Sequence, residues 1–457
     1  MRSTTTHALL VIEIVVLMLQ SQGASQDIKS LEANCYQDQI RVGTTSSSSL
    51  WEAGYFWSPL GGGMDRDVWA LGEFNGNLIA GGQFTIAGGT SARFIAVWDG
   101  NMWGPMASGM SGQVNDLAVY NDSLYAAGMF DSAGGVPVNY VAAWNGSSWL
   151  SLGSDMDDIT EVLKVYHGAL IVAGRFNYAG GVPSRFIAEW DGSQWDSLSS
   201  GMNGYNRALL VYHDTLIVGG VFTQAGGVSA NAIAAWDGVS WSNLGSGMQI
   251  QGDNPSVNCL AEFGGHLVAG GYFSTAGGIP ANNIAMWDGN VWSPLGAGMN
   301  GAVYSLVVHD GRLIAGGAFT QAGGLAVNNI ASWDGSTWDS LGLGIYGGAG
   351  IAYVFTLLSY RGYLVAGGFF LEAGGIPAQH IAVWGCCAGT TGNVDSDAED
   401  VVDISDLSAL VDFLFFGGAI SSCFQESDVD ESLAIDISDL TLLVDFLFFG
   451  ASLPACM

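Results

Sequence analysis

Carboxylates near the end of the chain are spaced like the ligands of a bound metal ion. From Asp428 to Asp439, the residues at positions 1, 3, 5, 7, 9 and 12 follow the ligand pattern of an EF-hand-type loop. Calcium is a hard cation that prefers oxygen ligands, so this spacing predicts a calcium site. The candidate ligands of this loop are Asp428, Asp430, Ser432, Ala434, Asp436 and Asp439.

A second acidic segment upstream has a related spacing but is two residues longer. Two departures lower the expected calcium affinity of the pair. Leu433 stands where such a loop has Gly at position 6, and Asn393 replaces an acid. The candidate ligands of this first loop are Asn393, Asp395, Asp397, Asp403 and Asp406.

Each acidic segment leads into an apolar stretch with helical spacing. The two stretches, "VVDISDLSALVDFLFFGG" and "AIDISDLTLLVDFLFFGA", are near copies of each other. Apolar residues recur at intervals of three and four, which predicts two amphipathic helices. An acidic loop that only caps such a helix is the alternative interpretation. The apolar positions are Leu407, Leu410, Val411 and Leu414, and Leu440, Leu443, Val444 and Leu447.

This doubled loop-and-helix unit resembles dockerin type I modules over about residues 389–456. Asp406 and Asp439 match the Asp that dockerins carry at position 12. The resemblance implies a small α-helical domain at 386–457 with calcium as its cofactor. It also implies attachment to a cohesin-like scaffold or cell-surface protein, chiefly in polysaccharide-degrading assemblies.

Upstream of the tail, one phrase recurs seven times. "AGGQFTIAGGTSARFIAVWDG" at Ala80–Gly100 returns with small changes at steps of 46, 46, 46, 51, 46 and 51 residues. A fixed period of this length is typical of propellers, solenoids and repeat arrays. The same Phe marks each copy: Phe84, Phe130, Phe176, Phe222, Phe273, Phe319 and Phe370.

Each period has the pattern of four short strands, which we call strands a to d in chain order. Asn-Gly, Gly-Gly and Asp-Gly turns separate the apolar, β-branched and aromatic runs. Four strands in each such period predict one blade of a β-propeller. In the first period the expected strands are Val68–Phe74, Leu78–Phe84, Phe94–Trp98 and Trp103–Met106.

The seven-fold repeat region lacks one strand at its C-terminal end and has one extra strand at its N-terminal end. After Trp384 the seventh copy lacks its strand d, while an unmatched strand d, "WSPLGGGM", precedes the first copy. Pairing Trp57–Leu60 with Ile381–Trp384 would cover both exposed edges. We therefore predict a mainly β fold, a closed seven-bladed β-propeller at 50–385, with the small helical domain behind it.

The repeats resemble kelch repeats and the central domain of galactose oxidase. The fuller phrase "GGxFTxAGGxxxxxIAxWDGxxWxxLGxGM" is similar to propellers of fungal cortical bud-site markers and of exported bacterial proteins. Copper chemistry is not expected. His167, His213 and His309 share one a–b turn position of the repeat, and equivalent turns around a ring lie too far apart to share a metal.

Two insertions indicate a binding face. Five extra residues fall between strand d and the next strand a, at Met248–Val257 and Ile345–Val354. Loops d–a and b–c share one side of a propeller, so this side is the candidate face for a glycan or protein ligand. Paired acids across the channel would suit acid–base catalysis. The candidates are Glu73 and Glu262, in a position held elsewhere by Val119, Val165, Val211 and Val307.

Composition limits the partners and the compartment. The 457 residues carry a net charge of −31, which disfavours nucleic acid and anionic membrane surfaces. Arg2, the apolar run Ala8–Leu19 and the small residues behind it predict a signal peptide at 1–24, followed by a linker at 25–49. No other stretch is long enough to span a membrane. We expect a secreted or cell-surface protein in which Cys259 is a buried free thiol.

Three functions remain open from the sequence. The first is a non-catalytic recognition protein, with the propeller as binding face and the tail as a calcium-dependent attachment module. The alternative is a polysaccharide-acting enzyme, a glycoside hydrolase or lyase, with the propeller as catalytic domain. A purely structural surface protein is a third interpretation. Clustered carboxylates on the loop face would favour catalysis, whereas exposed aromatic side chains there would favour glycan binding.

Overall fold

The computed structural model describes residues 56–100, 102–153, 156–348, 350–385, 402, 404–416, 429 and 437–449. The predicted signal peptide and linker lie outside them. Contacts divide the chain into two compact units. One unit is Trp57–Gly385, and helices α3 (Ile404–Phe416) and α5 (Ile437–Phe449) belong to the other.

The described part of Trp57–Gly385 forms seven four-stranded antiparallel sheets. In six of them the strands pair in chain order, a to d. The first three sheets are β2 (Val68–Phe74), β3 (Asn77–Gly82), β6 (Ile95–Trp98) and β7 (Trp103–Pro105); β8 (Gln113–Tyr120), β9 (Ser123–Met129), β12 (Val141–Trp144) and β13 (Trp149–Leu150); and β14 (Thr160–Tyr166), β15 (Ala169–Gly174), β18 (Ile187–Trp190) and β19 (Trp195–Ser197).

The other four sheets repeat this plan, and the last takes its outer strand, β1, from the start of the unit. They are β20 (Asn206–Tyr212), β21 (Thr215–Gly220), β24 (Ile233–Trp236) and β25 (Trp241–Asn243); β27 (Ser256–Phe263), β28 (His266–Tyr272), β31 (Ile284–Trp287) and β32 (Trp292–Pro294); β33 (Val303–His309), β34 (Arg312–Gly317), β37 (Ile330–Trp333) and β38 (Trp338–Ser340); and β40 (Tyr353–Tyr360), β41 (Tyr363–Phe369), β44 (Ile381–Gly385) and β1 (Phe56–Pro59).

Every b–c loop contains a small hairpin that the sequence pattern does not predict. Two of these hairpins gain a third strand from the insertions, β26 (Met248–Gln249) and β39 (Ile345–Tyr346). The hairpin strands are β4 (Ile86–Ala87) and β5 (Thr90–Ser91), β10 (Ser132–Ala133) and β11 (Val136–Pro137), β16 (Tyr178–Ala179) and β17 (Val182–Pro183), β22 (Gln224–Ala225) and β23 (Val228–Ser229), β29 (Thr275–Ala276) and β30 (Ile279–Pro280), β35 (Gln321–Ala322) and β36 (Leu325–Ala326), and β42 (Glu372–Ala373) and β43 (Ile376–Pro377).

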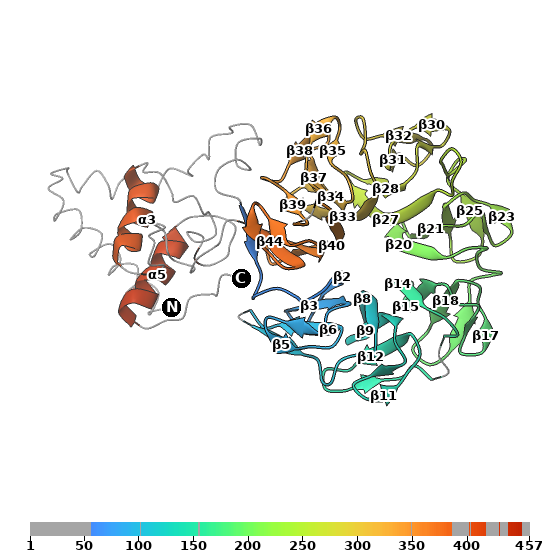
Figure 1. Cartoon of the computed structure of the whole chain (residues 1–457), viewed down its shortest axis with the longest axis horizontal. Coiled ribbons are helices and arrows are strands. Elements are labelled where there is room, and N and C mark those ends of the chain that lie inside the picture. The colour runs from blue at the N-terminus through green and yellow to red at the C-terminus, as the bar shows by residue number, and fades with distance from the viewer. Residues whose placement is uncertain are drawn as a thin grey trace, which may run out of the picture. The chain divides into compact units, whose positions relative to one another are not determined.

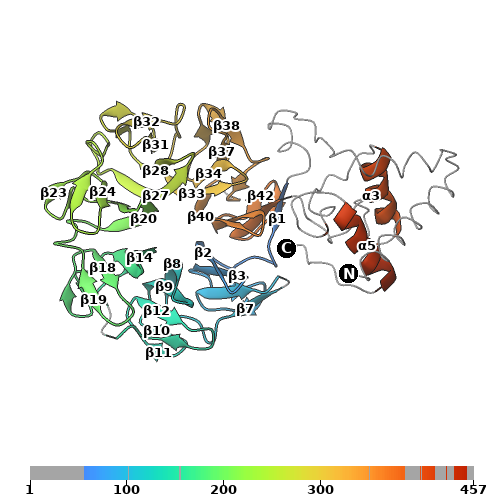
Figure 2. The same cartoon turned by 180° about the vertical axis from the view of Figure 1, so that it is seen from behind.

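The sheets stand around a common centre in a mainly β, propeller-like arrangement (Figures 1 and 2). Strand a of each sheet lies innermost, and each contacts strand a of the next sheet. The last contact, between β40 and β2, joins the end of the series to its beginning. The blade-like sheets therefore bury their faces against one another around the ring.

The expected pairing at the ring's closure is confirmed. Strand β1 is hydrogen-bonded to β44 and completes the last sheet. The Trp57 indole packs on Trp384 with ring centroids 5.4 Å apart, and its Nε1 donates to the Leu341 carbonyl at 3.0 Å. Trp57 is 1% exposed, so a side chain from the start of the unit is part of the core at its end.

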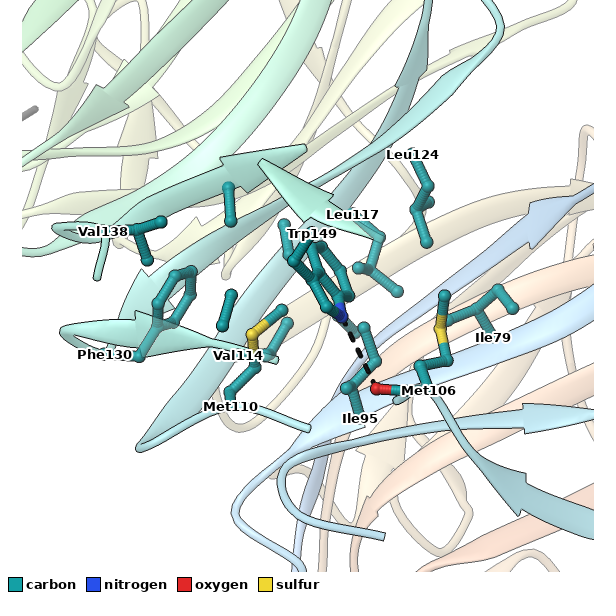
Figure 3. Packing of buried hydrophobic residues seen from close by; sticks show 14 of the residues in the cluster. Ile79, Ile95, Met106, Met110, Val114, Leu117, Leu124, Phe130, Val138 and Trp149 are labelled. Atoms are coloured by element: carbon teal, nitrogen blue, oxygen red, sulfur yellow. Dashed lines mark hydrogen bonds between the residues drawn. The ribbon is translucent and has the colours of Figure 1, made fainter. Parts of the chain in front are cut away.

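Neighbouring sheets are joined by apolar layers between them. Figure 3 shows one such layer, in which Ile79 and Ile95 of the first sheet meet Val114 and Trp149 of the second. The Trp149 Nε1 donates to the Met106 carbonyl at 3.4 Å, and five other strand-d tryptophans make the equivalent bond to the preceding sheet. In six of the seven sheets the strand-d Trp thus fastens one sheet to the next, whereas the buried Trp195 Nε1 makes no such bond.

Close packing between sheets explains a glycine inside strand b. A Cβ added to Gly81 would lie 2.5 Å from Cγ1 of Val114 in the next sheet. Because real Cβ atoms do not approach carbon so closely, only glycine fits here. The same clash faces Gly219, Gly270, Gly316 and Gly367.

The two described helices pack through the apolar positions expected from their spacing. Leu407 and Leu410 of α3 meet Leu440 and Leu443 of α5 in a small buried cluster. None of the helices in the described residues has the length and apolar character needed to cross a membrane.

Candidate functional site

Strand a of every sheet carries a β-bulge at the same place. In the first sheet Val68 pairs with Gly82 and Ala70 with Gly81, so Trp69 between them has no partner in the ladder. A bulge residue leaves the regular alternation, and such bulges re-aim side chains next to functional sites. The seven bulge residues are Trp69, Asn115, Glu161, Arg207, Asn258, Tyr304 and Phe355.

All seven bulge residues line one cavity of about 450 Å³, which we call the central cavity. Because all seven innermost strands contribute to it, the cavity lies at the centre of the ring. Each bulge is near the start of strand a, so the cavity is close to the d–a loops. Asp116, Val162, Arg175 and Thr356 complete its lining.

One side of the central cavity is aromatic. Trp69 stacks on Phe355 with ring centroids 4.3 Å apart and planes 12° apart. Tyr304 follows at 5.7 Å from Phe355, and Tyr353 lies 5.7 Å from the same ring. The three bulge residues come from the adjacent strands β33, β40 and β2, and together they form a continuous aromatic wall.

The opposite side is polar and is held in place by hydrogen bonds. The Asn115 amide donates to the Thr160 carbonyl at 2.9 Å and to Glu161 at 3.3 Å. Glu161 in turn accepts from the Arg175 guanidinium at 2.7 Å. Each of these contacts fixes a side chain before any ligand arrives, so this part of the wall is preorganised.

Arg207 is the second cation of the cavity and lacks an acidic partner. Its Nη1 donates to the Asn258 side-chain oxygen at 3.0 Å, and the Asn258 amide donates to the Val303 carbonyl at 3.1 Å. The guanidinium also lies over the Tyr205 ring, 5.4 Å from its centroid. Within the described residues no carboxylate lies at ion-pair distance from Arg207.

Asp116 adds a titratable group beside the bulge residues. Burial raises the pKa of this carboxyl to about 6, although the Leu163 and Leu117 amides donate to it and Lys164 lies near. Those amide bonds measure 2.7 Å and 2.9 Å. Desolvation of the charged form therefore outweighs the hydrogen bonds that favour it.

Both insertions border smaller pockets on the side of the d–a loops. The second insertion and the neighbouring b–c hairpin enclose about 360 Å³, lined in part by Tyr346, Ile351 and Tyr353. Asn254 and Pro255 of the first insertion border about 190 Å³. Because β26 and β39 pair with b–c hairpins, the expectation that these two loop types share one side is confirmed.

The candidate acid pair does not form in the cavity. Glu73 and Glu262 are exposed, stand near the far end of strand a, and are absent from the cavity lining. One residue of the repeat position assigned to them was also wrong. Glu73 faces Leu78 in the register, and the matching pair in the sixth sheet is Val308 with Leu313, so Val308 replaces Val307 in that set.

The interpretation of His309 was wrong by one residue. His167 and His213 occupy an a–b turn position with positive φ, 48° and 46°, but the sixth sheet places Asp310 there, at 47°. His309 is 1% exposed and fills the buried aromatic position that ends strand a, where Tyr166 and Tyr212 stand in other sheets. The shared turn position selects residues that tolerate a left-handed backbone, rather than metal ligands.

Of the candidate calcium ligands, only Asp406 and Asp439 fall within the described residues. Each is buried in the first turn of its helix, α3 or α5. A carboxylate is favourable there because it faces the positive end of the helix dipole. The remaining candidates lie outside the described residues: Asn393, Asp395, Asp397, Asp403, Asp428, Asp430, Ser432, Ala434 and Asp436.

Sequence comparisons assign no family to the chain. No family model matches it, and no curated protein sequence matches it.

Solved structures similar to this chain include WD40 repeat domains, all at low sequence identity. The RRP9 WD40 repeats give a TM-score of 0.48 at 14% identity, covering 73% of this chain and 98% of that one. The WD40 β-propeller domain of Doa1 gives 0.42 at 12% identity, covering 71% and 95%. The extracellular domain of BT4673 from B. thetaiotaomicron gives 0.47 at 10% identity, covering 73% of this chain but only 40% of that chain.

Proposed function

We propose that the chain is an exported, non-catalytic recognition protein. In this proposal the seven sheets are the blades of a closed, kelch-type β-propeller that binds a glycan in its central cavity. Residues 386–457 are a dockerin-like module that attaches the protein to a cohesin-like scaffold or cell-surface protein when calcium is bound.

The main support for ligand binding is the variation in residue type at the bulge position of strand a. The residue before each bulge is Val in five of the seven sheets, as expected for a buried packing position. The bulge itself holds six residue types in seven sheets, all of them aromatic, charged or amide-bearing. Packing alone gives no reason for a series of large and chemically different side chains, whereas ligand recognition does.

The composition of the cavity wall favours binding over acid–base catalysis. Asp116 and Glu161 are the acids among the lining residues. Glu161 is held by Arg175 and Asn115, and Asp116 accepts two backbone N–H bonds. An aromatic wall opposite amides and guanidinium groups suits a sugar ring, because its C–H face packs on the rings while its hydroxyls meet the polar side.

A polysaccharide array probed with the full chain tests this proposal. We expect saturable binding that falls about tenfold in Trp69→Ala, since the exposed face of a stacking ring is lost. Val119→Ala is the matched control, because Val119 is exposed on strand a at the far end from the bulge. Equal binding by Trp69→Ala would contradict the cavity assignment. Release of new sugar ends from a bound polysaccharide would establish the enzyme alternative instead.

Calcium titration of the full chain tests the attachment module. We expect two binding events and a gain of helical circular dichroism. Asp428→Ala and Asp439→Ala should each weaken one event, and Asp395→Ala and Asp406→Ala the other, because each removes an oxygen ligand. Asp253→Ala, an exposed acid between the sheets, is the control. Absence of heat and of helix gain at millimolar calcium would contradict this part of the proposal.

A further inference from the structure

The central cavity has the chemistry to select one kind of sugar. We infer that it binds a saccharide residue bearing a single carboxylate, such as a uronic acid, with Arg207 contacting the carboxylate and the aromatic wall contacting the ring. This inference rests on the proposed glycan-binding function and specifies its ligand class.

Arg207 has the hydrogen-bonding capacity that a carboxylate requires. A guanidinium offers five N–H donors in a planar fork, which matches a carboxylate in a two-point contact. Asn258 accepts from Nη1, and Tyr205 lies against the face of the group. Asn258 and Tyr205 thus fix the orientation of the fork without neutralising its charge.

Arg175 is the internal comparison for this argument. It also lines the cavity and also lies over Tyr205, 5.1 Å from the ring centroid. Its charge, however, is already neutralised by Glu161 at 2.7 Å. Of the two cations in the cavity, Arg207 is therefore the one whose charge is available to an incoming anion.

The distribution of charge over the unit supports the same assignment. Between Trp57 and Gly385 the sequence has 23 Asp and Glu but only eight Lys and Arg. Two of those eight bases line the central cavity, against two of the 23 acids. An acidic sugar is thus repelled by most of this surface and finds its favourable position in the cavity.

The acids of the cavity limit the charge that the ligand can carry. Glu161 and Asp116 line the cavity, so a doubly charged phosphate monoester would meet like charges on the polar side. The amides of Asn115 and Asn258 suit neutral hydroxyl groups. A ring with several hydroxyls and one negative charge satisfies both conditions.

The test compares matched acidic and neutral oligosaccharides against the full chain by calorimetry. Galacturonate oligosaccharides, their carboxyl-reduced forms and sulfated neutral oligosaccharides serve as probes, with EDTA present because uronates and the tail both attract calcium. Arg207→Met removes the charge and keeps much of the stem. Arg185→Met removes an exposed charge from the b–c loop of the third sheet and is the control.

We expect the wild type to prefer the uronate over its reduced form about 10- to 100-fold, the range for a charge-assisted hydrogen bond. Arg207→Met should abolish this preference, and its affinity for the uronate should fall far more than its affinity for the reduced form, for which only the bond that orients Asn258 is lost. Equal binding of uronate and reduced forms would overturn the inference yet leave the glycan-binding proposal standing. Preference for the sulfated probe would overturn the carboxylate assignment, and failure to bind any saccharide would overturn both.

Discussion

At the scale of single residues, the bulge position of strand a faces the central cavity instead of a neighbouring sheet, and its residue type varies between repeats. Val68 and its equivalents are buried between sheets, while the next residue bulges into the central cavity. The same spacing that reveals the repeat also reveals this position, because the bulge residues recur at the repeat's own steps. The repeated letters alone do not mark this position, because it is one of several that vary between copies and only the structure shows that it faces the cavity.

The pKa of Asp116 leads to a prediction for ligand binding. Because its pKa in the folded protein is about 6, the carboxyl loses its charge as the pH falls from 7 to 5. Glu161, Arg175, Arg207 and Lys164 are the charged groups around it. Losing one negative charge should tighten binding of a uronate oligosaccharide several-fold over this range. Calorimetry at three pH values checks this, and Asp116→Asn should show no comparable change.

The sign of the stability effect follows from the same shift. A carboxyl with a raised pKa binds its proton more readily in the folded state, so its contribution favours folding increasingly as the pH falls from 7 towards 4. Below the pKa of Asp116 in the unfolded chain, its carboxyl is protonated in both states and the free energy of unfolding no longer changes with pH through this group.

The acids of the c–d turns behave in the opposite way. The backbone amides of Thr337 and Ser336 donate to Asp334 and lower its pKa. Its stabilising contribution is present above about pH 4 and is lost as the pH falls through the lower folded value. Asp334→Asn should therefore reduce the loss of melting temperature in acid. Asn145 shows that the amide suits this turn, since it accepts from Ser147 and Ser148. An unchanged acid profile in the variant would contradict the assignment.

At the scale of elements, strand positions could be predicted but their ends and small hairpins could not. The expected Leu78–Phe84 and Phe94–Trp98 run longer than β3 and β6, because the chain leaves the sheet to form β4 and β5. Phe94 adopts a φ of 62°, which no β propensity anticipates. The alternation of apolar and polar residues and the turn residues specify the four-stranded sheets. The shortened strand ends and the small hairpins depend instead on contacts with other loops.

Sheet spacing gives a prediction for Gly81. Gly81→Ala places a methyl group 2.5 Å from Val114 in the next sheet, so we expect destabilisation of about 1–3 kcal/mol from overpacking. Gly104→Ala is the matched control, because its nearest new contact is 3.9 Å away and its φ is not positive. Denaturant unfolding measures both. If Gly81→Ala is as stable as the control, the first and second sheets can move apart at little cost, which would contradict the expected overpacking.

At the scale of the whole unit, the ring depends on a strand from its other end. The matched spare and missing strands allowed this pairing to be predicted, since an unpaired strand edge at each end demanded a partner. A central channel was expected from the ring, but its lining could not be predicted in the same way, because the seven bulge residues converge only in the closed ring.

Because Trp57 lies on the strand that closes the ring, its substitution tests whether closure stabilises the unit. Trp57→Ala removes a side chain that is 1% exposed, together with its bond to Leu341, and should cost about 3–5 kcal/mol. Val239→Ala, at a residue 83% exposed, is the control. Calorimetry and size-exclusion chromatography should show a lower melting temperature and association through the opened edge. A variant that melts with the control and stays monomeric would contradict closure through β1.

The closing strand also has a consequence for biosynthesis. Strand β1 is among the first parts of this unit to be translated, yet its partner β44 is among the last, and Trp57 and Leu341 are separated by 284 positions. At ordinary translation rates the early strand waits on the order of tens of seconds for its neighbour. Six sheets can form as they emerge, but the seventh requires the full length of the unit. A chain truncated before Ile381 is therefore left with an unpaired β1, and an export or quality-control system could recognise that exposed strand as the mark of an unfinished molecule.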